Sequence, residues 1–129
     1  MNNKVVVHHS NGNILKGETG DFFPNKPLFH LRVLGTNETK QIDIQNLKAV
    51  YFVETFEGDS TSEREDFRIE RTGFGKKIRI QFKDGEVQYG YTQGYSPDRP
   101  GFFISPCDPS SNNLRIFVVT GATVLIKFT

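Results

Sequence analysis

The sequence predicts an all-β protein made of two tandem five-stranded small barrels that arose by internal duplication. Twelve glycines and six prolines in 129 residues indicate many turns. Apolar and polar residues alternate along several short segments, which is the pattern of half-buried strands. No amphipathic helix longer than one or two turns is evident. The chain also resembles itself at an offset of 73 residues.

The repeat is clearest between residues 4–31 and 77–104, where seven of 28 positions are identical. Most identities are turn formers or apolar anchors: Lys4/Lys77, Gly12/Gly85, Gly17/Gly90, Thr19/Thr92, Pro24/Pro97, Pro27/Pro100 and Phe29/Phe102. With one inserted residue the register continues and aligns Val50 with Val124. A rival alignment of 47–53 on 114–119 requires a longer deletion, so we prefer the continuous register.

Each copy opens with the same hairpin and bend. The positions are Asn11, Gly12 and Gly17 in the first copy and Asp84, Gly85 and Gly90 in the second. An Asn-Gly or Asp-Gly pair favours a tight two-residue hairpin, since both residues tolerate positive φ. A glycine inside the following strand permits a sharp bend or a bulge. The pattern therefore predicts a strongly bent antiparallel sheet in each copy.

These boundaries divide the chain into a first barrel at 1–53, a connector at 54–75 and a second barrel at 76–129. The connector holds seven acids and three bases, a net charge of −4, so the remainder of the +1 chain carries +5. Such a charged segment is expected to be a solvated linker or an added edge strand. A docking role for it is the alternative.

Composition narrows the location and the class of partner. A net charge of +1 disfavours a nucleic-acid or membrane-surface binder that works by bulk electrostatics. No apolar run is long enough to span a bilayer or to serve as a signal peptide. The single cysteine, Cys107, fits an inert thiol in a reducing cytoplasm. We expect a cytoplasmic protein that has no membrane contact.

The sequence offers no catalytic residues, no metal site and no cofactor motif. His8 and His9 are adjacent on a strand, so they point to opposite faces and cannot chelate one ion together. The segment 73–77 lacks the spacing of a phosphate loop and leads into a strand. No Ser/His/Asp or Cys/His set lies in a strand-turn-helix context. We therefore expect a protein that is not an enzyme.

Aromatic residues gather around the proline-rich turn of the second copy. Tyr91, Tyr95 and Phe103, together with Arg99, are the candidate binding residues there. Phe103 and either Tyr89 or Tyr91 are expected to point outward. Such rings either pack the two barrels against each other within one molecule or form an interface with another protein.

The second copy resembles the Sm family. Residues 77–90 combine alternating apolar positions, Asp-Gly and a later glycine, and 118–126 are similar to the closing Sm motif. This resemblance implies bent five-stranded barrels that pair through their edge strands. It also implies single-stranded RNA binding as an alternative function, although Thr120 occupies the place of the arginine in the closing turn.

A closer resemblance is to an uncharacterised bacterial all-β family that occurs alone or beside PilZ and receiver domains. The similar phrases are Phe82–Glu86, Gly90–Pro97, Arg99–Phe103 and Asp108–Asn113. Arg64 and Arg68 match the first arginine pattern by which PilZ domains bind cyclic di-GMP, and Asp108–Asn113 nearly matches the second. The resemblance implies a regulatory context. We expect a non-enzymatic interaction module with a protein partner or self-association, and cyclic di-GMP sensing is the further alternative.

Overall fold

A computed structural model describes residues 2–57 and 71–128 of the chain. The all-β prediction is confirmed, because the described residues form ten strands and only two single-turn 3₁₀ segments. The elements are β1 (Asn3–His9), β2 (Ile14–Thr19), β3 (Leu28–Val33), β4 (Thr39–Asp43), η1 (Ile44–Asn46), β5 (Leu47–Val53), β6 (Lys76–Phe82), β7 (Val87–Thr92), β8 (Gly101–Pro106), β9 (Asn113–Val119), η3 (Thr120–Ala122) and β10 (Thr123–Phe128). Neither described stretch contains a helix long and apolar enough to cross a membrane.

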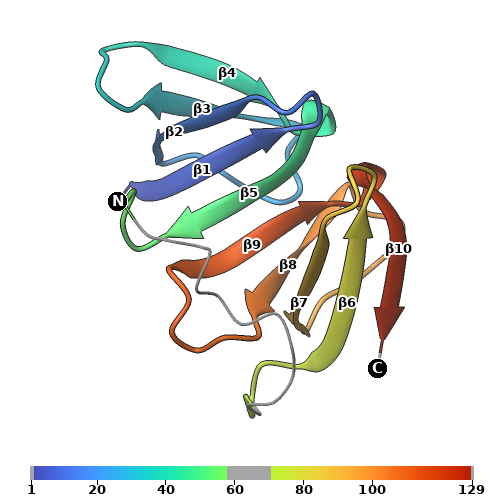
Figure 1. Ribbon diagram of the computed structural model, residues 1–129. Coiled ribbons are helices and arrows are strands. Elements are labelled where there is room, and N and C mark those ends of the chain that lie inside the picture. Colours follow the sequence, from blue (N-terminus) through green and yellow to red (C-terminus); the bar gives the residue numbers. More distant parts are fainter. Residues whose placement is uncertain (1, 58–70, 129) are drawn as a thin grey trace.

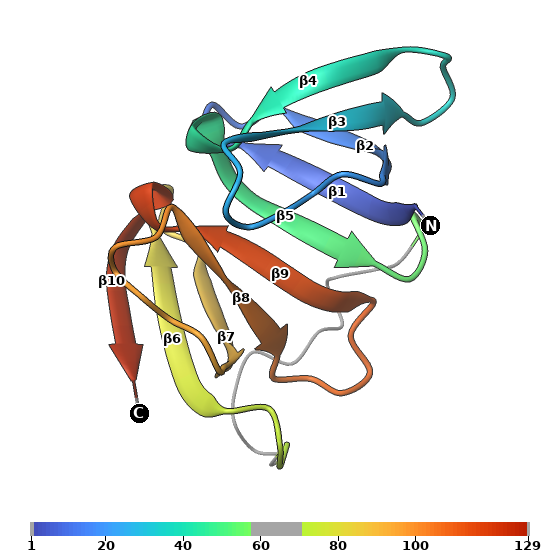
Figure 2. The ribbon, with the colours of Figure 1, turned by 180° about the vertical axis from the view of Figure 1, so that it is seen from behind.

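All ten strands belong to one open antiparallel sheet with the order β10-β6-β7-β8-β9-β5-β1-β2-β3-β4. Figures 1 and 2 show two five-stranded halves that meet where β5 and β9 lie side by side. Two tandem closed barrels are not confirmed. In neither half does the fifth strand pair with the fourth, because β5 pairs instead with β9 of the other half. The outer edges of the sheet are β4 and β10.

The strand registers show how the two halves correspond. Val7 lies opposite Val50, and Ile80 lies opposite Ile126. Since the offset of 73 equates Val7 with Ile80, the counterpart of Val50 is Ile126. The aligned pair Val50 and Val124 is therefore wrong by two residues. Between the paired residues Ile104 and Ile116 the chain is three residues longer than between their counterparts Leu31 and Lys40, whereas the sequence alignment allowed only one extra residue.

The two predicted hairpins are present, but their turns contain three residues. Gly12 donates its N–H to the carbonyl of His9, and the His9 N–H donates to the carbonyl of Asn13. Phe82, Gly85 and Glu86 repeat this pattern. Only the glycine has positive φ, +95° at Gly12 and +94° at Gly85. This is a type I turn followed by a left-handed residue, so the preceding Asn or Asp need not adopt positive φ as the two-residue prediction required.

One hydrophobic core runs through both halves. Val5 and Val7 of β1 and Ile78, Ile80 and Phe82 of β6 are buried, as the alternation predicts. All seven residues of β5 are buried, and the strand pairs along one edge with β1 of the first half and along the other with β9 of the second. The halves therefore share a core through β5.

Gly17 and Gly90 are equivalent positions where β2 and β7 pass close to a neighbouring strand. A Cβ at Gly90 would lie 2.6 Å from the carbonyl oxygen of Ser105, and one at Gly17 would collide with the carbonyl of Arg32. Both clashes involve backbone of the pairing strand, which cannot move without breaking the sheet.

We predict that Gly90→Ala lowers the free energy of unfolding by about 2–3 kcal/mol, as overpacking does in other cores. Gly94→Ala is the control, because its Cβ would meet no heavy atom within 4 Å. Urea unfolding of the two variants checks this. Equal stabilities would show that the close approach at Gly90 is absent.

Candidate functional site

A groove of about 870 Å³ lies beside β7 and β8. Tyr91 to Gly94 and Asp98 to Ser105 line most of it. Pro24 and Asn25 from the β2–β3 loop contribute from the first half, and Arg115 comes from β9. The groove is therefore built by both halves of the sheet.

Arg115 is the most distinctive residue of this groove. Its guanidinium carbon lies 4.4 Å from the ring centroid of Phe52 and 4.3 Å from that of Phe103. The register of the β5–β9 pair produces this contact, since Phe52 and Arg115 are directly opposite. Burial lowers the pKa of Arg115, but a guanidinium stays protonated at every physiological pH. Among the described residues, no acid forms an ion pair with it.

Three of the predicted binding residues line the groove. Tyr91 is buried and lies along it with Phe103, and Arg99 is an exposed residue of the adjoining turn. Tyr95 does not line it, because its ring packs against Phe102 and Phe128 instead. The prediction for Arg64 and Arg68 lies outside the described residues.

Phe103, which was expected to point outward, is partly buried, because its ring packs against rings of both halves. It lies 6.0 Å from Phe22, 5.8 Å from Phe52 and 5.2 Å from Phe117 between ring centroids. Of the two interpretations of the aromatic residues, this contact set fits packing within one molecule. Tyr91, one of two rings expected to face outward, is only 2% exposed.

A second polar cluster joins the two halves at the β6–β7 hairpin. The Lys48 ammonium lies 2.8 Å from carboxylate oxygens of both Asp84 and Glu86, and 4.7 Å from the centre of the Phe82 ring. Burial alone would lower the pKa of Lys48, but its hydrogen bonds to the two carboxylates outweigh burial and raise it. Two hydrogen bonds lower the pKa of Asp84: the one from the Lys48 ammonium has the larger effect, and the one from the backbone N–H of Glu86 comes second. This cluster is an electrostatic link between the halves.

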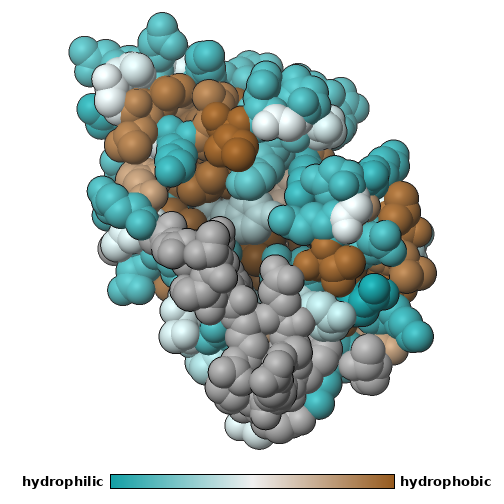
Figure 3. Space-filling view, in the orientation of Figure 1, coloured by the Kyte–Doolittle hydropathy of each residue, from teal (hydrophilic) through white to brown (hydrophobic). Residues whose placement is uncertain are grey.

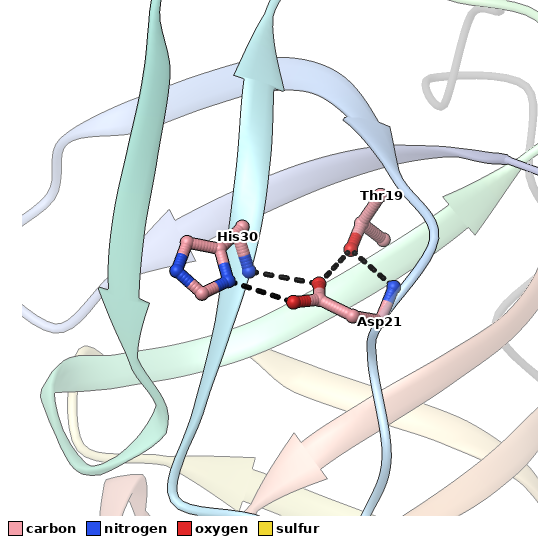
Figure 4. Close-up of polar contacts among 3 residues, drawn as sticks. All are labelled: Thr19, Asp21 and His30. Atoms are coloured by element: carbon pink, nitrogen blue, oxygen red, sulfur yellow. Dashed lines mark hydrogen bonds and ion pairs between the residues drawn. The ribbon is translucent and has the colours of Figure 1, made fainter.

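Figure 4 shows a third cluster, formed by Thr19, Asp21 and His30. The His30 ring Nδ1 lies 2.7 Å from the Asp21 carboxylate, which also accepts the backbone N–H of His30 at 2.9 Å. The Thr19 hydroxyl donates to this carboxylate and not to the imidazole. A catalytic triad needs its hydroxyl against the other ring nitrogen, so these bonds fasten the β2–β3 loop to β3 without activating Thr19.

Metal-ligating side chains are scattered over the described part of the chain. Within 2–57 and 71–128, no three His, Cys, Asp or Glu side chains are grouped so that they could hold an ion. Cys107 is 1% exposed, which fits the predicted inert thiol.

The sequence interpretation missed Arg115 and Lys48. Both owe their surroundings to residues of the other half, and neither belongs to a local motif. A weak signal was present for Lys48, which is a lone charged residue inside the apolar run 47–53. Arg115 had no comparable signal, because its partners become neighbours only when β5 pairs with β9.

The chain belongs to DUF6982, a family of unknown function, whose family model matches residues 1–127. No curated protein and no solved structure matches the chain. The match agrees with the expectation of an uncharacterised family. It shows no link to Sm-like, PilZ or receiver domains.

We predict that Lys48→Met lowers the free energy of unfolding at neutral pH by about 1–2 kcal/mol, because two carboxylates lose their shared cation. The pKa of Asp84 then returns toward its ordinary value. A carboxyl with a depressed folded-state pKa stabilises the fold above its unfolded-state pKa, and this contribution disappears as the pH falls through the folded-state value. The free energies of unfolding of the variant and the wild type should therefore converge in acid.

Urea unfolding across pH checks this prediction for Lys48→Met, with Lys83→Met as the exposed control. A difference in the free energy of unfolding that persists in acid would contradict the prediction.

We predict that Asp21→Asn also lowers the free energy of unfolding at neutral pH, but by less than Lys48→Met does. The backbone N–H of His30, and then its ring, lower the pKa of Asp21. The loss at neutral pH should be under about 1 kcal/mol, since the Asp21 side chain is 45% exposed. Thermal melts at neutral pH, and in acid below the folded-state pKa of Asp21, check this. If the loss of thermal stability were equal or larger in acid, the expected link between the Asp21 pKa and stability would be refuted.

Proposed function

We propose that this member of the family is a non-enzymatic binding module that holds an extended acidic segment of a partner protein in the groove beside Arg115. The observation that carries the proposal is the Arg115 guanidinium, held between Phe52 and Phe103 without an acidic partner among the described residues. The proposed setting is the bacterial cytoplasm, in a regulatory or signalling pathway, with Sm-like ancestry for each half.

A fixed guanidinium is well suited to bind a carboxylate. Its planar group presents several N–H donors in a rigid fork, and carboxylates accept two of these donors in parallel. The two rings restrict the side chain before a ligand arrives, so less conformational entropy is lost on binding. Arg115 is exposed, so a carboxylate can reach its guanidinium from solvent.

The remaining lining suits a polypeptide that carries both acidic and apolar side chains. Phe74 supplies half-buried aromatic surface, Tyr91 and Phe102 form the nearly buried floor, and Arg99 adds a second cation. Asp98 is the one acid among the described lining residues, whose charges sum to +1. The charge and the apolar surface of the groove thus complement a segment in which Glu or Asp alternates with apolar residues.

A protein partner is favoured over nucleic acid by the small number of cations. Binding to single-stranded RNA draws affinity from several phosphates along a basic track, whereas this groove offers two arginines. Cyclic di-GMP sensing would rest on Arg64 and Arg68, which lie outside the described residues. Both ligands are therefore kept as outcomes of the experiment.

Selection from a random peptide library displayed on phage tests this proposal. Wild-type protein should enrich acidic peptides, and Arg115→Met should lose at least about tenfold in affinity for them, as expected when a charge-assisted bond is removed. Arg79→Met is the matched control, because Arg79 lies 6.0 Å from the Tyr89 ring centroid and does not line the groove. Thermal melts of both variants confirm folding.

Three results would reject the proposal. The first is no enrichment above a blank surface. The second is enrichment that Arg115→Met leaves unchanged. The third is tighter binding of oligouridine or cyclic di-GMP than of any selected peptide at physiological salt, which would move the function to that ligand class.

A further inference from the structure

The two outer edges of the sheet are the counterparts of the two strands that pair at its centre. β10 corresponds to β5, and β4 corresponds to β9. β5 has neighbours on both sides, whereas within the described residues β10 pairs only with β6. The fold therefore pairs the outer edge of β5 with β9 and leaves the equivalent edge of β10 at the surface of the described sheet.

The apolar side chains of β10 remain on that surface. Val124 is 60% exposed, and Leu125 and Phe128 are each 43% exposed. Their counterparts in β5 are Lys48, Ala49 and Phe52, which are 8%, 0% and 3% exposed. Figure 3 shows apolar surface at the right-hand side of the molecule, over β10. Seven large hydrophobic residues are exposed in the described part of the chain, and three of them lie on this one edge strand of six residues.

We propose that β10 pairs antiparallel with β10 of a second copy of this chain, which would join the two sheets about a two-fold axis. An unprotected apolar edge strand offers both backbone hydrogen-bonding groups and side chains to a similar strand. The internal β5–β9 pairing shows that a strand in this position of the repeat accepts a neighbour on its free edge. The proposal goes beyond the groove function and uses different residues.

Head-to-tail pairing of β10 with β4 of another copy is the alternative suggested by the repeat. If it copied the β5–β9 register, Lys127 would lie directly opposite Lys40, where the internal pair has Tyr51 opposite Ile116. Two lysines in directly opposed positions repel each other. β4 also places Thr39 and Gln41 where β9 has Arg115 and Phe117. A polar strand with a central lysine is a common protection against edge pairing.

Two-fold pairing of β10 with itself avoids this repulsion. With Ile126 opposite its own copy, Val124 faces Phe128 and Leu125 faces Lys127. No two lysines are then directly opposed, and the aliphatic stem of Lys127 covers Leu125 while its ammonium reaches solvent. The three exposed apolar side chains all gain partners.

Native mass spectrometry and sedimentation of the full chain over a dilution series test the proposal. Wild type should form a dimer and no larger species. Leu125→Lys should raise the dimer Kd by about tenfold or more, because two like charges enter a symmetric interface. Leu114→Lys is the matched control, since Leu114 is also an exposed apolar residue, at 61%, but lies in β9. It should leave the dimer unchanged.

Lys40→Glu separates the two pairing modes. In two-fold pairing, β4 plays no part and this substitution leaves the dimer unchanged. In head-to-tail pairing it would place a carboxylate opposite Lys127, strengthen association and extend it beyond dimers, which would overturn the proposal. A wild-type chain that stays monomeric at every concentration would overturn it as well. Unfolding curves at the lowest concentration verify that each variant folds, and peptide binding in the groove is scored separately.

Discussion

The pairing of β5 with β9 is the interaction on which the rest of this structure depends. It converts two five-stranded halves into one sheet, and it explains why β5 is buried along its whole length. One edge of β5 places Val50 and Phe52 opposite Val7 and Val5 of the first half, and the other edge places them opposite Phe117 and Arg115 of the second. Neither half closes into a barrel, because the strand that would close the first half is engaged by the second.

The same pairing creates the candidate site. Arg115 lies opposite Phe52 only because β9 is aligned with β5 in this register, and Phe103 reaches the guanidinium from the adjacent strand. Lys48 meets the acids of the β6–β7 hairpin for a related reason, since it too crosses from one half to the other. A duplicated fold thus acquires chemistry at its junction that neither copy contains alone.

Local signals predicted the strands, and long-range pairing set the details that they missed. The alternation of Val5 and Val7 identifies a buried face because side chains in a strand alternate. Gly90 was expected to permit a bend or a bulge, and the structure shows that its missing side chain lets β7 approach the backbone of Ser105. The equivalence of Val50 and Ile126 was missed because loop insertions leave no periodic signature. Partners of Arg115 were unpredictable for a different reason, since they are distant in sequence and no local pattern encodes the β5–β9 pair.

The most direct test of this account is amide hydrogen exchange resolved by residue. If β5 and β9 join the halves into one cooperative unit, their slowest amides should exchange as slowly as those in β1 and β6, through a single global opening. Fast exchange along β5 and β9, with each half opening at its own free energy, would contradict the account. The halves would then be independent units, and the groove at Arg115 would lack a fixed geometry.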